Sequence, residues 1–471
     1  MTRFTFTIFD HQHNALREIL TKGGTNESVA MILCGRSEQR DPWTGEDEHR
    51  FIVREIIEVG PEHIENQTPV NVTWSTTPFY NLVKQAASKD YAVAAVHSHP
   101  NGPLTFSDAD DVADRELLEI AFNRNESRKP HLTMIMDGDG NLLARAYDAE
   151  LKSHPVAMIR IIGSRWSFAY PERNKFETPE ALDRQARVFG TAATHDISQL
   201  RFGIAGGGGT GSAISILLPR IGARKLALFD RDRVVHTNLN RLHFATQSDA
   251  NRARLKVDVL ADAIAALGLN TSVRAFDASI DEPKVRDAVK ACDVIFGCTD
   301  DHLGRLMLNR LAHFYGIPVI DMGLLINRNE TDTAFDVFDG RVTVVQPGTP
   351  CQLCRGLIDP AIARIEALKR TRSTEFALHR AAGYIPDGGD PSPVVVTFTT
   401  ELATMAINEL FQRITLFRGE DGSCAERIRR FDVPKEADTI AGGRSRSGCP
   451  LCSSSAKYVG RGDMTPFLDI A

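Results

Sequence analysis

Two histidines, a serine and an aspartate follow one another at a spacing that can build a metal centre. His97 and His99 lie two residues apart in a run that is expected to be a strand, so both side chains point to the same face. After seven intervening residues, Ser107 is a natural helix N-cap, and Asp110 follows in the first turn of that helix. Two imidazoles and one carboxylate, with a fourth position left for water, form the ligand set of a catalytic zinc site.

A catalytic zinc site also needs a group that moves protons. Zinc lowers the pKa of its bound water towards about 7, and a nearby carboxylate then takes up the proton. Glu27, just before the apolar run 29–35, is the candidate base, and Glu18, in an expected helix, is the alternative. Ser107 is a candidate hydrogen-bond donor to a tetrahedral oxyanion. The competing interpretation is a strand with two solvated histidines that precedes an ordinary capped helix.

This set of residues resembles the motif of the JAB/JAMM metallopeptidases, in which a glutamate precedes H-x-H, seven residues and S-x-x-D. The resemblance covers about residues 1–150 and fills every motif position. It implies that the two histidines and Asp110 bind zinc, that Glu27 is the general acid/base and that Ser107 assists. Members of this family cleave peptide or isopeptide bonds that follow the C-terminus of ubiquitin or of a ubiquitin-like protein.

A second chemical motif lies in the glycine-rich run 203–212, where Gly206, Gly208 and Gly211 stand in G-x-G-x-x-G register. The run follows an expected strand and opens an expected helix, and in that context glycines let the backbone approach phosphates. Asp230 ends the next expected strand, where a carboxylate can hold a ribose hydroxyl. These residues alone fit an NAD-dependent enzyme as well as an ATP-dependent one.

The residues that follow favour ATP. Arg241 and Lys256 can neutralise a triphosphate, whereas a dinucleotide needs far less positive charge. Asp300, just beyond the carboxyl end of a buried strand, can hold Mg²⁺ that bridges the phosphates. The complete set that we predict to bind ATP and Mg²⁺ is Gly206, Gly208, Gly211, Asp230, Asp232, Asn238, Arg241, Lys256 and Asp300.

From about residue 183 to residue 452 the chain resembles the ubiquitin-activating superfamily, which includes the bacterial activators of the thiamine and molybdopterin sulfur carriers. The matching motifs are D-x-D-x-V at 230–234, N-L-N-R at 238–241 and C-T-D at 298–300. The resemblance implies attack of a C-terminal glycine carboxylate on the α-phosphate of ATP, which gives an acyl-adenylate and pyrophosphate. Positioning and charge neutralisation carry such a reaction.

The same resemblance matches Arg184 to an arginine that reaches the triphosphate of the partner subunit, which implies a homodimer. Two positions depart from the family pattern: Leu242, where glutamine is common, and Asp301, where asparagine is common. Neither departure is expected to prevent adenylation. The residues predicted to act in catalysis, in both halves of the chain together, are Glu27, Ser107, Arg184, Arg241, Lys256 and Asp300.

Four of the eight cysteines form two C-x-x-C pairs, Cys351 with Cys354 and Cys449 with Cys452. Together the pairs can give a closed Cys₄ zinc site, and the family resemblance supports zinc at these places. Two redox or accidental pairs are the alternative.

No cysteine occurs in residues 355–423, where activators that form a thioester usually carry one. We therefore expect the acyl group to stop at the adenylate or to pass directly to another protein. An ester on Thr371, Ser373 or Thr374 is a further hypothesis. Outside the C-x-x-C pairs, we interpret Cys292, Cys298 and Cys424 as structural.

The apolar pattern around these residues predicts two α/β units. Residues 1 to about 150 alternate expected strands, among them 91–99 and 131–138, with helices such as 108–122. From residue 201 to residue 298 a β-α-β alternation predicts a parallel, doubly wound, Rossmann-like sheet. We assign 1–150 to a mixed α/β metallopeptidase domain, 151–195 to a linker with a helical segment, and 196–471 to an adenylation domain with Cys₄ zinc knuckles. Three later segments are expected to be a polar stretch to about 393, an apolar helix at 400–417 and a loose tail from 436.

Composition narrows the classes of partner. The formal net charge of −6, without a long basic run, argues against nucleic acid. No run approaches the roughly 18 apolar residues of a membrane span, and residues 1–20 lack the apolar core of a signal peptide. We therefore expect a cytoplasmic protein that has no membrane partner.

Together the motifs predict a bifunctional enzyme. One half activates a ubiquitin-like protein that ends in glycine, and the other half trims the precursor of that protein or reverses its conjugation. A conjugating enzyme is then an expected partner. The first competing interpretation is activation of a sulfur carrier for cofactor or cysteine synthesis. Two different classes of function also stay open at this point, an NAD-dependent oxidoreductase and a catalytically silent scaffold that binds a ubiquitin-like tail.

Overall fold

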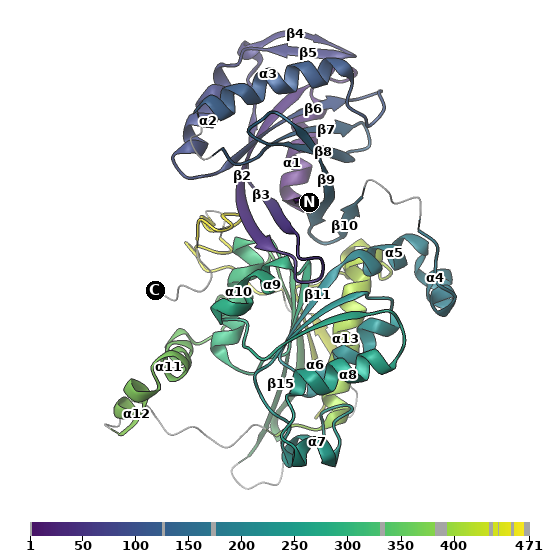
Figure 1. Cartoon of the computed structure of the whole chain (residues 1–471), viewed down its shortest axis with the longest axis vertical. Helices are drawn as coiled ribbons and strands as arrows, with labels where there is room; N and C mark the ends of the chain where they lie inside the picture. The colour runs from purple at the N-terminus through teal and green to yellow at the C-terminus, as the bar shows by residue number, and fades with distance from the viewer. Residues whose placement is uncertain are drawn as a thin grey trace.

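Two large β-sheets, one in each half of the chain, carry the functional residues (Figure 1). The computed structural model describes residues 2–124, 128–170, 176–329, 335–381, 393–432, 437–440, 442–453 and 456–465. Within those residues, no helix is both long enough and apolar enough to span a bilayer.

The sheet of the first half has the strand order β1-β3-β2-β6-β7-β8-β9-β10, and β1 also pairs with β9. Its strands are β1 (Arg3–Phe9), β2 (Val29–Arg40), β3 (Asp47–Glu58), β6 (Ala92–His99), β7 (His131–Asp137), β8 (Leu142–Tyr147), β9 (Ser153–Ile162) and β10 (Trp166–Ala169). A separate hairpin joins β4 (Ile64–Thr68) to β5 (Asn71–Trp74). The helices are α1 (Asp10–Thr21), α2 (Thr77–Ala87) and α3 (Asp108–Arg124).

Helices cover both faces of this first sheet. Leu16 and Leu20 of α1 pack into one apolar cluster, while Phe79 of α2 and Leu118 of α3 pack into another. Strand β6 alternates between the two clusters: residues 92, 94 and 96 join the first, and residues 93 and 95 join the second. Because side chains alternate along a strand, residues 97 and 99 face the side of α2 and α3.

The second sheet has the order β13-β12-β11-β14-β15-β16-β17-β18. Its strands are β11 (Arg201–Ala205), β12 (Lys225–Phe229), β13 (Ser272–Phe276), β14 (Val294–Gly297), β15 (Val319–Arg328), β16 (Phe335–Val345), β17 (Glu426–Arg430) and β18 (Ala437–Ile440). The pairs from β13 to β15 are parallel, as predicted, and β16 to β18 add antiparallel pairs that were not predicted.

Helices lie on both faces of the second sheet, so the predicted doubly wound architecture is confirmed. Helices α6 (Gly209–Arg220), α8 (Lys256–Ala266) and α13 (Val396–Thr415) pack on one face, and α9 (Arg286–Ala291) and α10 (His302–Phe314) pack on the other. The remaining helices are α4 (Asp183–Phe189), α5 (Thr191–Gln199), α7 (Gln247–Asn251), α11 (Pro360–Thr371) and α12 (Ser373–Ala381). Figure 1 shows α11 and α12 projecting from the body of this half.

Three segments differ from the sequence prediction. Residues 153–169 of the predicted linker form β9 and β10, because apolar residues of VAMIRII are buried when β9 pairs with β1. The expected polar stretch after 355 contains α11, which begins at an Asp359 N-cap, and α12. The expected loose tail contains β18, and residues 459–464 bond to both halves.

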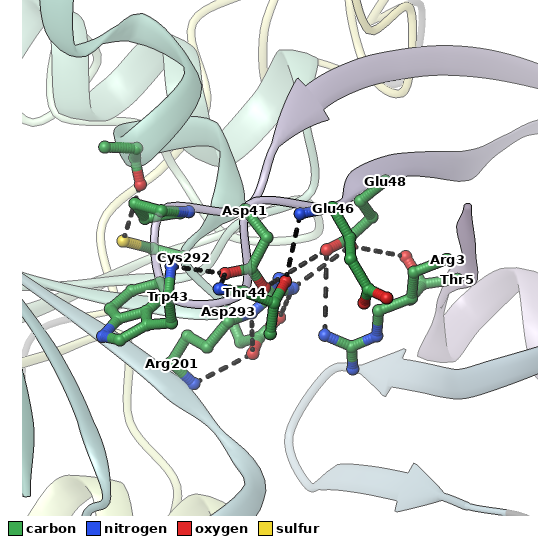
Figure 2. A network of polar contacts seen from close by, with 12 residues as sticks. Arg3, Thr5, Asp41, Trp43, Thr44, Glu46, Glu48, Arg201, Cys292 and Asp293 are labelled. Carbon is green, nitrogen blue, oxygen red and sulfur yellow. Dashed lines mark hydrogen bonds and ion pairs between the residues drawn. The ribbon is translucent and has the colours of Figure 1, made fainter. Parts of the chain in front are cut away.

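A buried network of charges joins the two halves (Figure 2). Arg201, the first residue of β11, donates to Asp293 of its own half at 3.0 Å and to Glu48 of β3 at 3.1 Å. From the first half, Arg160 of β9 donates to Asp293 at 2.6 Å. Arg50 of β3 reaches the carbonyl of Cys292 at 3.2 Å. Each of these charged groups is at most 2% exposed, so each depends on its partners for the charge interactions that water would supply.

Apolar and backbone contacts surround this network. One apolar cluster contains Phe9, Met158 and Trp166 of the first half together with Phe202 and Phe296 of the second. At the β2–β3 turn, the Trp43 indole N–H donates to the carbonyl of Ser272. The Asp463 carboxylate accepts hydrogen bonds from the Glu38 N–H, the Lys290 ammonium and the Tyr315 hydroxyl. A continuous core and a shared polar network therefore hold the halves together.

We expect replacement of Arg201 by methionine to lower the free energy of unfolding by about 3–5 kcal/mol, because Glu48 and Asp293 would lose their shared partner. Urea denaturation measures this change. Arg187→Met is the matched control: Arg187 is 76% exposed and pairs within its own helix, so its loss should have little effect. Equal stability of the two variants would contradict the role given to the network.

The network should also make the protein sensitive to acid. Burial alone would raise the pKa values of Glu48 and Asp293, but Arg201 and its neighbours outweigh burial and lower both. A lowered folded-state pKa gives stability that is complete above the unfolded value of about 4 and is lost as the pH falls below it. The urea concentration at the unfolding midpoint should therefore decrease as the pH is lowered from about 5 to about 3. The fall should be smaller in Glu48→Gln, and an identical fall would contradict this assignment.

Candidate functional site

The first candidate site lies at the end of β6, where His97 and His99 point toward α3. Their Nε2 atoms lie 3.0 Å apart, and His97 Nε2 lies 3.1 Å from Asp110 Oδ1. Two ligands of a tetrahedral zinc ion lie about 3.3 Å apart when the bonds are about 2.0–2.1 Å long. The His99 Nδ1 atom is 2.9 Å from the Pro103 carbonyl, a contact that leaves Nε2 free for a metal. The donor atoms therefore fit the predicted zinc ion.

Helix α3 holds Asp110 through its N-cap. The backbone N–H and the hydroxyl of Ser107 both donate to Asp110 Oδ2, at 2.7 and 2.8 Å, so Oδ1 faces His97. Burial would raise the Asp110 pKa, but His97 and Ser107 outweigh it and lower it well below its usual range. Burial lowers the pKa of His97, but the hydrogen bond and the charge of Asp110 exceed that effect and raise it. The Ser107 hydroxyl is committed to Asp110 in this arrangement, and its oxyanion role stays a prediction.

Glu27 reaches the same site from a different strand. Antiparallel pairing sets Val29 opposite His97, so Glu27, two residues earlier, comes beside His99. Its Oε1 atom lies 3.7 Å from His99 Nε2. Burial raises the pKa of the Glu27 carboxyl, and the charges of the two histidines offset this only in part. The alternative base, Glu18, is exposed on α1, the helix that packs on the opposite face of the sheet.

The second candidate site is a cavity of about 750 Å³ at the carboxyl ends of β11, β12 and β14. Gly206 has φ of +100°, and a Cβ there would meet the Cys298 carbonyl oxygen at 2.6 Å. A Cβ on Gly211 would collide with the Gly206 carbonyl, so this glycine lets α6 approach the strand. Gly208 has open space around its Cα, and α6 begins at the next residue. This loop can receive phosphates at a helix N-terminus.

Charged side chains surround the glycine loop. Asp230 accepts a hydrogen bond from the Gly207 N–H at 2.6 Å, and burial raises its pKa against the opposing charge of Lys256. The Lys256 ammonium is buried and lies 2.8 Å from Asp232. Most of the predicted nucleotide residues line this cavity, namely Gly206, Gly208, Asp230, Asp232, Asn238, Arg241, Lys256 and Asp300. Its volume lies in the range of small-molecule sites.

Two predicted residues lie elsewhere. Gly211 is buried within α6 and does not line the cavity. Arg184 is exposed on α4 and also lies outside the lining of this cavity. Its predicted role in a partner subunit stays a prediction.

The sequence analysis missed Arg370, which reaches the cavity from α11. Arg370 donates to Asp281 at 2.6 Å and also pairs with Asp301, the residue that replaces the common asparagine. Asp301 in addition caps α10 by accepting from the Gly304 N–H. The Asp-Pro start and the helix-forming composition of 359–371 were the available signal for α11. The aspartate at position 301, where the family commonly has asparagine, is thus paired with the Arg370 guanidinium.

The two C-x-x-C pairs meet. The Cys351 and Cys449 sulfurs lie 3.8 Å apart, and those of Cys354 and Cys452 lie 3.5 Å apart. Zinc–sulfur bonds of about 2.3 Å place two ligands of a tetrahedral site about 3.8 Å apart. All four sulfurs lie within 4.8 Å of one another, which fits a Cys₄ zinc site. The alternative of two independent pairs is therefore not favoured.

The cysteines outside this cluster suit a structural role. Cys292 and Cys424 are buried, and burial raises the pKa of both thiols. Burial also raises the pKa of Cys298, next to the glycine loop. A raised pKa disfavours the nucleophilic thiolate.

We expect metal analysis to find about one zinc per donor set, because the two sets are chemically complete and separate. His97→Ala should remove only the ion of the β6 site, and Cys354→Ser only that of the cysteine cluster. Cys424→Ser is the control and should keep both. Loss of both ions from either single variant would contradict the separation of the sites.

Comparisons with known proteins agree with this two-part organisation. Residues 182–451 match the ThiF family, and residues 10–148 match the prokaryotic homologs of the JAB domain. The SAMP-activating enzyme E1 of Haloferax volcanii is 27% identical over 151 residues, 32% of this chain and 51% of that protein. The molybdopterin-synthase adenylyltransferase of Escherichia coli is 30% identical over 155 residues, 32% of this chain and 56% of that protein.

The matches thus span about half the length of these two curated relatives. Among solved structures, E. coli MccB with succinimide is similar at 16% identity and a TM-score of 0.43, over 59% of this chain and 75% of that chain. The ThiF match alone covers more than half of the 471 residues. The chain belongs to the ThiF family and carries, ahead of that domain, a domain of the prokaryotic JAB homologues.

Proposed function

We propose that this protein adenylates the C-terminal glycine of a ubiquitin-like protein and also cleaves peptide or isopeptide bonds that follow that protein. The observation that carries this proposal is that one chain brings together two sets of candidate site residues. One is the cluster of Glu27, His97, His99 and Asp110, and the other is the cavity around the glycine loop. Both activities address the same flexible peptide terminus, which gives a physical reason for the fusion.

In the adenylation half, the glycine loop and the N-terminus of α6 would hold the phosphates, and Asp230 would hold the ribose. A carboxylate oxygen of the substrate attacks the α-phosphorus, an acyl–phosphate bond forms, and pyrophosphate leaves with the electrons of the broken P–O bond. Arg241 and Lys256 line the cavity and would neutralise the charge that develops on the phosphates. Asp300 would bind Mg²⁺.

In the peptidase half, His97, His99 and Asp110 would hold zinc, which supplies an activated water molecule when bound. Glu27 lies beside His99 with a raised pKa, so it suits the transfer of a proton from that water to the leaving amine. Burial raises the pKa of the Glu27 carboxyl, and this direction makes its carboxylate a stronger proton acceptor.

The buried thiols support direct transfer of the acyl group rather than a thioester on this chain, and a conjugating protein is the expected acceptor. The names of the two curated relatives, an E1 activating enzyme and an adenylyltransferase, support the first half of the proposal. Activation of a sulfur carrier is the second candidate, which a further relative favours, the sulfur carrier protein ThiS adenylyltransferase of Bacillus subtilis. Pairing of Arg184 with a second subunit, and therefore a homodimer, belongs to the same proposal.

ATP–pyrophosphate exchange tests the adenylation half. With a ubiquitin-like protein that ends in glycine, the wild-type chain should exchange label, and Lys256→Ala should lower the rate about 100-fold because the phosphates lose a cation. Lys284→Ala is the control, since Lys284 is exposed and lies outside the cavity. Exchange that persists in Lys256→Ala, or nicotinamide reduction in its place, would contradict this assignment.

Cleavage of a ubiquitin-like protein with a C-terminal extension tests the peptidase half. Glu27→Gln should lower kcat by about 10²–10⁴-fold while zinc stays bound, because the proton acceptor is lost and the ligands remain. Glu18→Gln, a change to the exposed carboxylate on the far face, should cleave like the wild type. Unchanged cleavage in Glu27→Gln would refute the role of that residue.

A further inference from the structure

The β4–β5 hairpin holds the peptide backbone of Glu27 from both sides. The Glu27 N–H donates to the carbonyl of Thr68 at 2.8 Å. The side-chain amide of Gln67 donates to the Glu27 carbonyl at 2.7 Å and to the Ser28 hydroxyl at 3.1 Å. Two neighbouring residues of β4 thus fix the peptide groups that flank the proposed base.

The same peptide is tied to the strand that carries the histidines. The Ser28 N–H donates to the Ser98 hydroxyl at 2.8 Å, and the Ser98 N–H donates to the Ser28 carbonyl at 2.9 Å. A Cβ on Gly23 would come within 2.7 Å of both the Ser28 hydroxyl and the Gln67 amide, so the chain around this contact is closely packed. The Gln67 amide therefore belongs to one connected set of bonds from β4 to β6.

The hairpin itself is anchored to the protein core. Ile64, Val72 and Trp74 pack against the apolar cluster beneath α2, and the rings of Trp74 and Phe79 make a T-shaped contact with 6.4 Å between centroids. Because the hairpin is packed against the core, its hydrogen bonds can hold the backbone of Glu27 in one position, which a loop without such packing could not do.

We propose that Gln67 is a positioning residue for the peptidase reaction, acting through the backbone of Glu27. This inference rests on the proposed peptidase function. The Glu27 carboxylate reaches the histidines from a residue outside β2, so the two β4 contacts and the bonds to Ser98 determine where it lies. Because proton transfer requires hydrogen-bond reach, a displacement of about 1 Å can lower the rate by about 10²-fold.

Gln67→Met removes the donor at nearly constant size and is the test variant. We expect kcat to fall at least about tenfold, with KM and zinc content unchanged, since substrate and metal contacts remain. Gln67→Glu, of the same length and also without the donor, is the second variant in case the first does not fold. Asn66→Ala, at the neighbouring exposed position of β4, is the matched control and should keep wild-type kinetics.

A double-mutant cycle separates positioning from a general structural role. If Gln67 acts through Glu27, Gln67→Met should not lower the residual rate of Glu27→Gln further. An equal fall in both backgrounds, or wild-type kcat in Gln67→Met, would overturn the role of Gln67 alone. A wild-type chain that binds zinc but cleaves no extended ubiquitin-like protein would overturn the peptidase proposal and this role with it.

Hydrogen exchange in the metal-free chain provides a readout that does not depend on activity. We expect the amides of Glu27 and Ser28 to exchange faster in Gln67→Met, while amides in β7 keep their protection. Unchanged exchange at both positions would show that the Gln67 amide does not hold this peptide, and would overturn the inference whatever the kinetics.

Discussion

The guanidinium of Arg201 is shared by three carboxylates, those of Asp41 and Glu48 from the first half of the chain and that of Asp293 from the second. Glu48, Asp293 and Arg201 are almost completely removed from water, so these charges are stabilised by one another and by neighbours that include Arg50, Arg160 and Asp41. Burying such charges is unfavourable unless the geometry is maintained. The buried charges therefore fix the position of one sheet relative to the other at the junction. The apolar cluster around the network fixes it over a larger area.

Each candidate site is connected to this network by one strand, β2 for the first site and β11 for the second. The 12 residues of β2 run from the neighbourhood of Glu27 and His97 to the junction, a length of about 36 Å. The five residues of β11 run from Arg201 to the glycine loop, about 13 Å. Strands in the interior of a sheet are stiff, so the two sites share a fixed frame. In the proposed function it is then the substrate terminus, rather than the halves of the enzyme, that must move between the sites.

Many residues of both candidate sites could be predicted from the sequence because their placement depends on local spacing. The two-residue interval of His97 and His99, the N-cap at Ser107 and the glycine register after β11 each follow from the geometry of one element. Each C-x-x-C pair is also a local pattern, although the contact between the two pairs joins distant parts of the chain. The prediction for 153–169 was wrong because Pro155 suggests a break, yet it lies near the start of a strand that is otherwise apolar.

The contacts that were missed join residues far apart in the chain. Arg201 and Glu48 are 153 residues apart, and each is a single charge on an ordinary strand. Gln67 is an ordinary polar residue until the hairpin brings it to Glu27, 40 positions earlier. Arg370 lies on α11, inside the segment that the sequence analysis expected to be a polar stretch, and its partners Asp281 and Asp301 lie 89 and 69 residues earlier. Periodicity and motif spacing carry no information about such pairs, because the fold alone determines them.

The position of Asp463 has a consequence for how the protein is made. Its carboxylate joins Glu38 to Lys290 and Tyr315, so the junction is incomplete until residue 463 has left the ribosome. Arg50 and Arg160 also bind Asp293, which is synthesised 133 residues after Arg160. During translation the final packing of the first half is therefore completed late, by residues from the opposite half of the molecule.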